Sequence, residues 1–310
     1  MRASLLTLLA LLWVGCERTP DASASAAAPG AKSSGVSDSA RVLQDDVGRT
    51  VRVPAQPQRV VSLAPSVTEL IVAVGGGNVL AARTPYCDHP EGVQTLPVVS
   101  TYPLDREALV ATEADLVIGT DQINDPGDGD GLQPFGIAAY YLRFETLADV
   151  ARGMRTVGGL LGTETFAEAA AAAFEQGITA RQPTGLEVPD LLLLIGDDVL
   201  YGFGEASYVH DMVARAGARS VSATLPGEAV TLSSEWVLAQ APDVIVVLAG
   251  TDYQAADLLR AQPAWATVPA LAQGRVCGID PDLVVRPGPR LTEGLDALAV
   301  CIAGEEGARY

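Results

Sequence analysis

The chain has 310 residues, of which 48% are hydrophobic and 19% are charged, so it can bury one large core or two smaller ones. Its formal net charge of −18 argues against a nucleic-acid partner, because a protein that binds a phosphate backbone needs a basic surface. An acidic globular protein remains, and its function has to be read from the motifs along the chain.

The first residues have the pattern of an export signal. Arg2 precedes an apolar run over 5–14, which is too short to span a bilayer unaided but typical of a signal peptide. The run ends in Trp-Val-Gly-Cys, which resembles a bacterial lipobox, although Trp13 departs from the usual leucine. We therefore predict a signal peptide over 1–15 and lipid attachment to Cys16. An ordinary secretory signal with a chance cysteine is the alternative.

Residues 16–41 are mainly alanine, serine, glycine and proline, with almost no large apolar side chain. Such a segment cannot bury enough surface to offset its chain entropy, so we predict a disordered tether. A flexible linker of this length reaches on the order of 28 Å. The predicted location is periplasmic, with the protein held at the membrane through its lipid anchor only.

The folded part is predicted to begin with an α/β lobe over 42–145. Alternation of apolar residues and turn signals predict a hairpin, two strands and a helix, over 45–53, 59–63, 79–82 and 68–74 respectively. The segment 84–90 reads Thr-Pro-Tyr-Cys-Asp-His-Pro and follows the end of a strand, which is where open α/β sheets bind ligands.

Two stretches of the chain have a matching pattern. Glu107 opens a short amphipathic helix that is followed by Asp115 and an apolar strand, and Glu235 opens a second one that is followed by Asp243 and another strand. We interpret the match as an internal repeat that marks two equivalent lobes. The alternative is that any two βαβ units look somewhat alike.

Between the repeats lies an alanine-rich segment over 163–181. Alanine has the best helix propensity, and early acids with a late arginine suit the helix dipole. Thr163 is expected to cap this helix, which lies in a connecting helical segment over 146–187. Residues 188–310 form the predicted second lobe. The predicted fold is α/β, with two α/β lobes joined by a single long rigid helix.

Five segments support a family resemblance, because they stand in the order typical of one family. They are Arg59-Val-Val-Ser-Leu-Ala-Pro-Ser-Val-Thr-Glu69, Tyr86-Cys-Asp-His-Pro90, Leu104-Asp-Arg-Glu107, Ala114-Asp-Leu-Val-Ile118 and Arg286-Pro-Gly-Pro-Arg290. The chain, over about 41–303, resembles the substrate-binding proteins of ABC importers for cobalamin, siderophores and haem, which have the class III periplasmic binding protein fold. The resemblance implies a cleft between two lobes, an importer permease as partner, and no enzymatic activity.

The resemblance also implies positions for the ligand site. Six residues are predicted to contact the ligand: Tyr86, Tyr102, Tyr201, Phe203, Asp282 and Arg286. Aromatic walls with a few polar groups suit a large planar ligand. Each tyrosine has the alternative of being a packed loop residue, and Arg286 that of pairing with Asp282. Where the cobalamin binders carry tryptophans, this chain has Tyr102, Thr120 and Ala229, which weakens the corrinoid assignment.

In the cobalamin-binding members, one surface acid on each lobe docks onto arginines of the permease. The matching positions are Glu107 and Glu235, so the resemblance implies permease docking for both. Ion pairs at the rim of an interface would mainly orient the encounter and raise its rate. The alternative is that both acids merely stabilise the dipoles of their own helices.

Cysteine and histidine are the residues on which metal or enzyme chemistry could rest in this chain. A bridge between Cys277 and Cys301 is predicted, because an exposed thiol in an oxidising compartment tends to be paired. Cys87 then remains beside His89, and an enzyme built on this pair is the competing class of function. The segment 120–130 is faintly similar to a calcium loop but lacks the required glutamate, so we predict a mobile loop and no metal site. No catalytic residue and no resident cofactor are predicted.

The ligand is predicted to be a metal chelate. A cobalamin-like corrinoid comes first, because the segments 86–90 and 286–290 look most like those of the cobalamin binders. A ferric siderophore, favoured if Arg143 and Arg286 converge on a negative ligand, comes second, and haem comes third.

Overall fold

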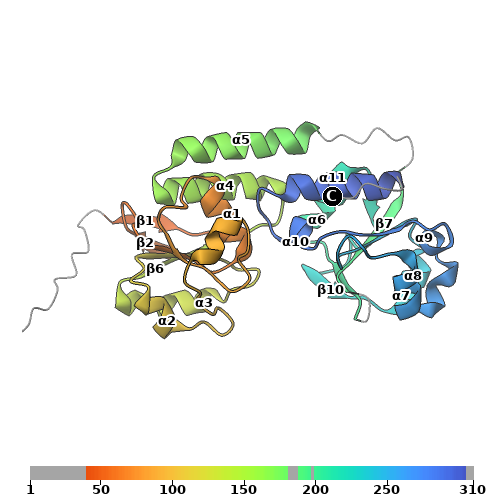
Figure 1. Cartoon of the computed structure of the whole chain (residues 1–310), viewed down its shortest axis with the longest axis horizontal. Coiled ribbons are helices and arrows are strands. Elements are labelled where there is room, and N and C mark those ends of the chain that lie inside the picture. Colours follow the sequence, from red (N-terminus) through yellow and green to blue (C-terminus); the bar gives the residue numbers. More distant parts are fainter. Residues whose placement is uncertain (1–39, 181–187, 197–198, 305–310) are drawn as a thin grey trace, which may run out of the picture. The chain divides into compact units, whose positions relative to one another are not determined.

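The computed structural model describes residues 40–180, 188–196 and 199–304, all of them within one compact unit, Val36–Tyr310. Figure 1 shows two groups of strands in this unit, each covered by helices. The predicted signal peptide, Cys16 and all but the last two residues of the tether lie outside the described residues. Within the described ranges, no helix is both long enough and apolar enough to cross a membrane.

The first lobe is built on a four-stranded parallel sheet with the order β4-β3-β5-β6. Its strands are β3 (Val60–Ser62), β4 (Leu80–Ala82), β5 (Leu116–Thr120) and β6 (Ala138–Leu142). Its helices are α1 (Pro65–Ala73), η1 (Glu91–Thr95), α2 (Arg106–Ala111), α3 (Pro126–Asp130) and η2 (Gln133–Phe135). An antiparallel hairpin of β1 (Arg41–Gln44) and β2 (Thr50–Val53) packs beside β6.

Helices cover both faces of this sheet, because its strands bury side chains on both sides. Successive side chains of a strand point to opposite faces. Leu116 and Ile118 of β5 therefore join the core formed with α1 and α4, whereas Val117 joins a separate core that includes Leu109 of α2. The helix that carries Glu107 thus lies on the opposite face from the connecting helices.

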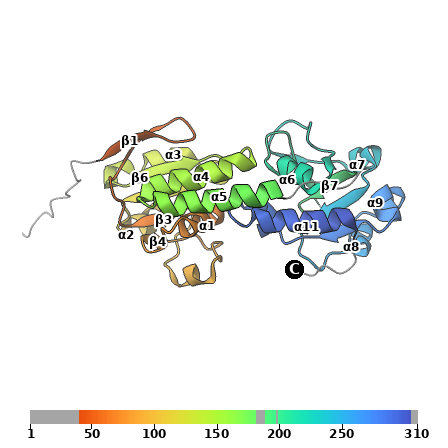
Figure 2. The ribbon, with the colours of Figure 1, turned by 90° about the horizontal axis from the view of Figure 1, so that it is seen from above.

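The connecting segment consists of two helices, α4 (Leu147–Leu161) and α5 (Glu164–Ala180). They lie side by side in Figure 2. A capping box of Thr146 and Asp149 begins α4, and Gly162 ends it in a left-handed conformation with φ of 74°. As predicted, α5 forms one uninterrupted helix, and it contacts α1 of the first lobe and α11 of the second.

The predicted cap of α5 was wrong. The Thr163 hydroxyl is buried and has no hydrogen-bond partner. The reason is that the end of α4 already fixes this residue, whose backbone N–H donates to the carbonyl of Gly158. The side chain of Thr163 therefore cannot serve the first turn of the next helix.

The second lobe is also built on a four-stranded parallel sheet, with the order β12-β11-β7-β9. Its strands are β7 (Asp190–Leu194), β9 (Arg219–Ser220), β11 (Val244–Val247) and β12 (Val276–Gly278). Its helices are α6 (Val209–Ala216), α7 (Ser234–Gln240), α8 (Ala255–Ala261), η3 (Pro263–Thr267), α9 (Pro269–Ala272), α10 (Asp282–Val285) and α11 (Leu291–Ala303). A small antiparallel ribbon of β8 (Tyr201–Phe203) and β10 (Ala229–Thr231) extends this lobe.

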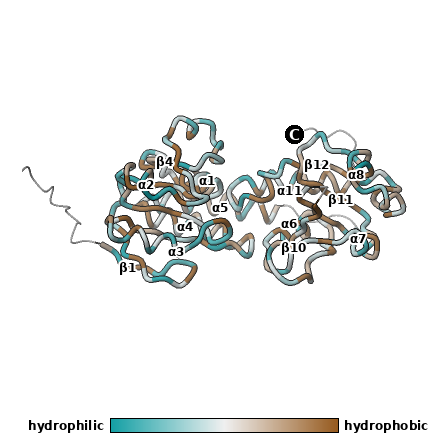
Figure 3. The backbone as a smooth tube through the Cα atoms, turned by 90° about the horizontal axis from the view of Figure 1, so that it is seen from below, coloured by the Kyte–Doolittle hydropathy of each residue, from teal (hydrophilic) through white to brown (hydrophobic). Residues whose placement is uncertain are grey.

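The faces of the second sheet are covered in the same way. Val244 and Val246 of β11 pack with α6 and α11, whereas Ile245 packs with α7, α8 and η3 on the other face. Figure 3 shows the hydrophobic character of β11, which is buried along its whole length. The core that faces the connecting helices is continuous through both lobes, so α4, α5 and α11 share one hydrophobic cluster.

The two sheets have the same topology, because β3, β4, β5 and β6 correspond in chain order and in position to β7, β9, β11 and β12. The details of the repeat match as well. Glu113 and Ala241, the non-glycine residues with positive φ among those described, each lie two residues before the matching aspartate. Asp115 accepts backbone N–H groups from the chain entering β3, and Asp243 accepts one from Asp190 at the start of β7. These equivalences favour the repeat over a chance likeness of βαβ units.

Other predicted elements shift by a few residues. The first strand of the hairpin lies over Arg41–Gln44 rather than after residue 45, and Arg41 donates to the carbonyls of Gly159 and Leu160. The helix predicted from residue 68 begins at Pro65, since proline suits the first helical turn. The segment 120–130, predicted as a loop, contains α3, which Asp125 caps by accepting from Gly127.

Candidate functional site

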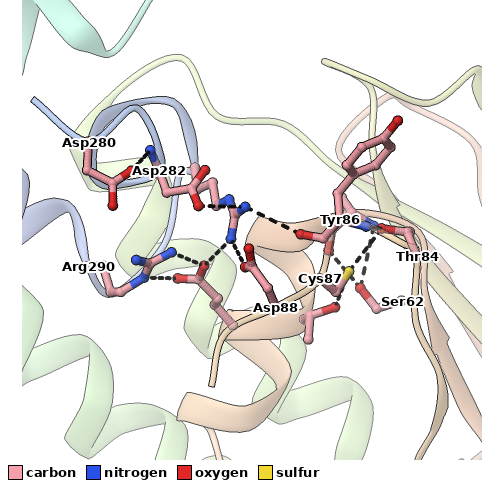
Figure 4. Close-up of polar contacts among 12 residues, drawn as sticks. Ser62, Thr84, Tyr86, Cys87, Asp88, Asp280, Asp282 and Arg290 are labelled. Carbon is pink, nitrogen blue, oxygen red and sulfur yellow. Dashed lines mark hydrogen bonds and ion pairs between the residues drawn. The ribbon is translucent and has the colours of Figure 1, made fainter. Parts of the chain in front are cut away.

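The two lobes are joined by a cluster of ion pairs that we call the arginine clasp, made of Glu69, Asp88, Asp282, Arg286 and Arg290. Glu69 and Asp88 belong to the first lobe, and the other three residues belong to the second. Glu69 lies on α1 and its side chain is only 1% exposed. Figure 4 shows the clasp beside the segment 84–90 that follows β4.

Both arginines of the clasp contact Glu69. Arg290 forms two hydrogen bonds to it, from Nε at 3.0 Å and from one terminal nitrogen at 2.6 Å. Arg286 approaches the same carboxylate at 3.4 Å. A buried carboxylate needs such charge-assisted partners, because desolvating a charge without them is strongly unfavourable. The buried Glu69 is therefore the centre of the contact between the lobes.

Arg286 is fully engaged within the clasp. One terminal nitrogen lies 2.6 Å from Asp88, and the other lies 2.7 Å from Asp282 and 3.3 Å from the carbonyl oxygen of Tyr86. The alternative that Arg286 pairs with Asp282 is thus realised, but this pair is only one part of a larger network. The Arg286 guanidinium also fixes the backbone of the segment that carries Tyr86.

The clasp changes the acidity of its outer carboxyl groups. The hydrogen bond from Arg286 holds the pKa of Asp88 below its ordinary value of 3.8. Burial raises the pKa of Asp282, and although the charge of Arg286 opposes this rise, the carboxylates of Asp280 and Asp88 add to it. Burial is therefore the main cause of the raised pKa of Asp282, and the largest charge effect on this pKa, that of Arg286, acts in the opposite direction.

The local sequence explains why these groups meet. Glu69 lies on α1, the helix that follows β3, and Asp88 lies in the segment that follows β4. Both residues therefore lie beyond the carboxyl ends of parallel strands. Arg286 and Arg290 follow β12 and α10 and flank the segment Pro-Gly-Pro, which cannot extend a helix. Ends of this kind are the usual ligand positions of open α/β sheets.

A second contact joins the lobes through Gln122 and Glu228. The Gln122 side chain donates to a carboxylate oxygen of Glu228 and to the carbonyl of Phe144. Gln122 follows β5, and Glu228 precedes β10, where its carbonyl accepts from Gly204. Burial raises the pKa of Glu228, and Asp121 and Glu145 add to this effect while the Gln122 hydrogen bond opposes it.

The first-lobe tyrosines predicted to contact a ligand are exposed. The Tyr86 residue is 72% exposed, and its ring points away from the ion pairs in Figure 4. Tyr102 is 91% exposed and precedes the α2 helix. Two large aromatic rings left in solvent are more consistent with a binding surface than with packed loop residues.

The second-lobe aromatic residues differ from each other. Tyr201 is 45% exposed at the start of β8, whereas Phe203 is only 8% exposed and belongs to the core shared with the connecting helices. Tyr201 and Phe203 are two residues apart and so point to the same side of the short strand β8, but only the Phe203 end of the strand packs against the core. Phe203 can offer at most an edge to a ligand.

Cys87 does not provide an enzyme site with His89. The thiol is buried and is not in a disulfide, and it contacts the hydroxyls of Thr68 at 3.0 Å and Thr84 at 3.1 Å. Figure 4 shows the contact with Thr84. His89 is exposed to solvent. The other histidine, His210, contacts the carbonyl of Gly204, and burial lowers its pKa.

The residues predicted to dock a permease occupy equivalent places. Glu107 and Glu235 lie in the first turns of α2 and α7, and both are exposed. Asp105 and Ser233 cap the two helices with their side chains. The helix dipole therefore favours a negative charge at both positions, whatever else they do.

Cys277 and Cys301, the pair for which the sequence predicts a bridge, form a disulfide in the structure. It joins β12 to α11, so it ties the last helix to the edge of the second sheet. A hydrogen bond from Arg275 to the carbonyl of Ile302 supports the same contact.

A pocket of about 300 Å³ lies on the first lobe, where Asp46, Arg143, Glu145, Asp149 and Arg152 line it. Its arginines are already paired, Arg143 with Asp121 at 2.6 Å and Arg152 with Asp46 at 2.6 Å. Arg143 belongs to this pocket, whereas Arg286 belongs to the clasp. Among the described residues, no group of three or more His, Cys, Asp or Glu side chains could hold a metal ion.

Sequence reasoning missed four residues at the contact between the lobes. Glu69 and Arg290 end two of the motifs that support the family resemblance, so a signal for them was present but no role was assigned. Gln122 lies in the segment 120–130, for which the sequence predicts a mobile loop. Glu228 carries no motif, and only the three-dimensional structure could find it.

Comparison with known proteins supports the resemblance. Residues 60–283 match the family model described as periplasmic binding protein. A vitamin B12-binding protein of Pectobacterium carotovorum is 29% identical over 252 residues, which cover 80% of this chain and 88% of that one. An uncharacterized ABC transporter substrate-binding lipoprotein of Bacillus subtilis, YvrC, is 25% identical over 84% of each chain.

A solved structure extends the match to the fold. The periplasmic heme binding protein from Pseudomonas aeruginosa aligns with a TM-score of 0.69 and 29% identity, covering 79% of this chain and 92% of that one. These matches confirm the predicted resemblance and the predicted fold class, the class III periplasmic binding protein fold.

Proposed function

The chain belongs to the periplasmic binding protein family, and we propose that it binds a corrinoid between its two lobes and delivers it to an importer permease. It is a substrate-binding protein of the ABC importer type, and members of the family are transport components rather than enzymes. The finer proposal concerns the ligand, its position and the anchor.

One observation carries the proposed position of the ligand. The exposed Tyr86 belongs to the segment that Arg286 holds from the other lobe. Tyr201 of the second lobe is also exposed, and Glu228, next to the ribbon that Tyr201 begins, reaches Gln122 of the first lobe. The clasp therefore lies beside an exposed tyrosine, and the contact between Gln122 and Glu228 lies at the Phe203 end of the ribbon that carries Tyr201. Polar contacts with aromatic side chains nearby suit a large, flat and mostly apolar chelate.

The corrinoid is favoured over other chelates by the relatives. Proteins described as vitamin B12-binding match over most of this chain, and the segments 86–90 and 286–290 look most like those of cobalamin binders. The match to a heme binding protein of known structure supports haem as the second candidate. Both ligands are large planar rings, so the exposed tyrosines suit either.

The anchor and the docking surface complete the proposal. Lipid attachment to Cys16, followed by the tether, would hold the protein at a membrane, and the relative YvrC is described as a lipoprotein. Glu107 and Glu235 would meet basic residues of the permease, one for each lobe. Their equivalent helices support this role, because equivalent sites on two lobes suit a partner built of two similar halves.

The binding test uses visible absorbance. The purified protein is incubated with cyanocobalamin, cobinamide, haem or ferric siderophores, desalted, and read for coloured ligand that remains with it. We expect a corrinoid to remain at close to one per protein molecule. Retention of haem with no retention of either corrinoid would overturn the corrinoid assignment, and retention of none would overturn the proposed binding function.

A further inference from the structure

The charges at the contact between the lobes bear on the ligand that the protein selects. Around the clasp lie four carboxylates, those of Glu69, Asp88, Asp280 and Asp282, and two guanidinium groups, those of Arg286 and Arg290. Formal charge on this side is therefore negative. Asp280 belongs to the group because it accepts the backbone N–H of Asp282, as Figure 4 shows.

The second contact, between Gln122 and Glu228, has an excess of carboxylates as well. Glu228 accepts a hydrogen bond from Gln122 of the first lobe, and the carboxylates of Asp121 and Glu145 raise the pKa of Glu228 while the charge of Arg143 lowers it. Arg143 itself is neutralised, because its Nε lies 2.6 Å from Asp121. Among the groups named, carboxylates thus outnumber cations at both of these contacts.

Both arginines of the clasp already bind carboxylates, Arg290 through two hydrogen bonds to Glu69. Both terminal nitrogens of Arg286 already have two oxygen partners each, at 2.6 to 3.4 Å. Its side chain is only 11% exposed. An anionic group of a ligand would have to displace Asp88 or Asp282 and would then face the displaced carboxylate. Like charges held close in a partly buried site are unfavourable.

We infer that the site selects uncharged or positively charged chelates and disfavours anionic ones, with Asp88 and Glu228 as the residues that set this selectivity. The inference rests on the proposed function and narrows its ligand class. Asp88 is suited to this role because its side chain is 55% exposed and so can face a ligand while it holds Arg286. Glu228 is suited because it is exposed and belongs to the rim of the second lobe.

The candidate ligands differ in charge. Cobalamin is uncharged and aquo forms of cobinamide are positive, whereas haem carries two propionates. A corrinoid would thus meet no charge penalty at this site, and a ligand with free carboxylates would. The effect is electrostatic, so it should weaken as salt shortens the screening length.

The test compares chelates that differ mainly in charge. Positively charged ferrioxamine B and uncharged ferrichrome form one pair, and aquo and dicyano cobinamide form another, with negatively charged ferric enterobactin and haem as the anionic probes. Binding to the purified protein is measured by tryptophan fluorescence or calorimetry at low and high salt. We expect the positive member of each pair to bind at least as tightly as the neutral member. The anionic probes should bind about tenfold more weakly than the neutral members, or more weakly still.

Two isosteric variants locate the effect. Asp88→Asn and Glu228→Gln should each raise the relative affinity for anionic probes several-fold at low salt. Glu168→Gln is the control, because it removes the same charge from an exposed residue of α5. Arg155, the partner of Glu168, keeps its second ion pair with Glu175, so the fold should be little affected. This variant should leave the charge selectivity unchanged. Asp88→Asn also loosens Arg286, so Glu228→Gln is the cleaner variant.

The outcomes separate the two proposals. Tight binding of an anionic chelate to the unaltered protein, or a charge preference that neither variant changes, would overturn the charge selectivity while the binding function stands. Absence of binding for every chelate would overturn the proposed function and this inference with it.

Discussion

The two lobes share one topology but contribute different chemistry where they meet. Each has a parallel sheet of the same strand order, and each has a helix with an acid in its first turn on the face away from the connector. At the clasp, however, the first lobe supplies only carboxylates, Glu69 and Asp88, whereas the second supplies both arginines together with Asp282. The repeated scaffold positions loop ends at the same place, and the loops themselves carry the function.

The largest expected effect concerns the feature that the lobes share. If Glu107 and Glu235 both dock the permease, the double variant Glu107→Arg, Glu235→Arg should lower ligand uptake by cells at least tenfold, because charge reversal places like charges across the interface. Ligand affinity of the purified protein should stay within about twofold. The reversal Glu164→Arg, in the first turn of α5, provides the control.

Either of two results would contradict the docking role: unchanged uptake, or a loss of uptake that is matched by an equal loss of ligand affinity. Single reversals sharpen the comparison. If the lobes are equivalent, Glu107→Arg and Glu235→Arg should lower uptake by similar factors.

The next effect concerns the feature that differs between the lobes. Glu69→Gln leaves Arg290 and Arg286 without their shared buried carboxylate, and breaking a buried ion pair from one side typically costs about 3–5 kcal/mol. We expect urea unfolding to show a loss in the lower part of that range, since both arginines retain some access to water. A loss no greater than that of Glu168→Gln, an exposed acid on α5, would show that the clasp does not stabilise the protein.

The disulfide is a further difference, since it stabilises the second lobe alone. The double variant Cys277→Ala, Cys301→Ala should lower the free energy of unfolding by about 3 kcal/mol, the value expected for a closed loop of this length. Thermal unfolding of the protein with and without reductant gives an independent reading. If reductant destabilises the double variant as much as the unaltered protein, the loss of stability under reductant does not come from the disulfide.

Smaller effects are expected at Asp115 and Asp243, the matching aspartates of the repeat. Asp115 accepts two backbone N–H groups and Asp243 accepts one, so Asp115→Asn should cost about 1–3 kcal/mol and Asp243→Asn somewhat less. Urea unfolding of the two variants measures the difference. A larger loss at Asp243 would contradict the equivalence of their roles.

The smallest effect is the pH dependence of Asp88. Arg286 lowers the pKa of Asp88 in the folded protein, so this carboxylate stabilises the fold above its ordinary pKa of 3.8, and the stabilisation is lost as the pH falls through the lower folded value. Asp88→Asn should therefore be less stable than the unaltered protein near neutral pH, with a gap that closes in strong acid. The urea midpoints of both proteins, measured across this pH range, test the effect. A stability gap that does not close in acid would exclude it.

Sequence reasoning reached the fold because the fold depends on strong local patterns. Apolar strands, the alanine-rich helix and the Glu107 and Glu235 repeats each determine structure within a short window. Where it failed, a contact from outside the predicted segment decided the outcome. The end of α4 fixes Thr163, and Arg49 reaches the carbonyl of Pro126 at the start of α3.

The site was harder to predict for the same reason. The clasp joins residues that are 198 to 221 positions apart, so no local pattern shows that Glu69 and Asp88 meet Arg286 and Arg290. The family motifs drew attention to the right segments, but they did not say which side chains touch. Phe203 illustrates the limit, because an aromatic residue in a glycine-rich segment reads as exposed and is buried.

The central claim is that one ligand contacts both lobes at once, and hydrogen–deuterium exchange with and without saturating cobinamide tests it most directly. The account predicts slower exchange in the first-lobe segments 84–90 and 121–124 together with the second-lobe segments 201–204 and 227–229. Protection confined to one lobe, or protection only at the pocket around Arg143 and Arg152, would contradict it.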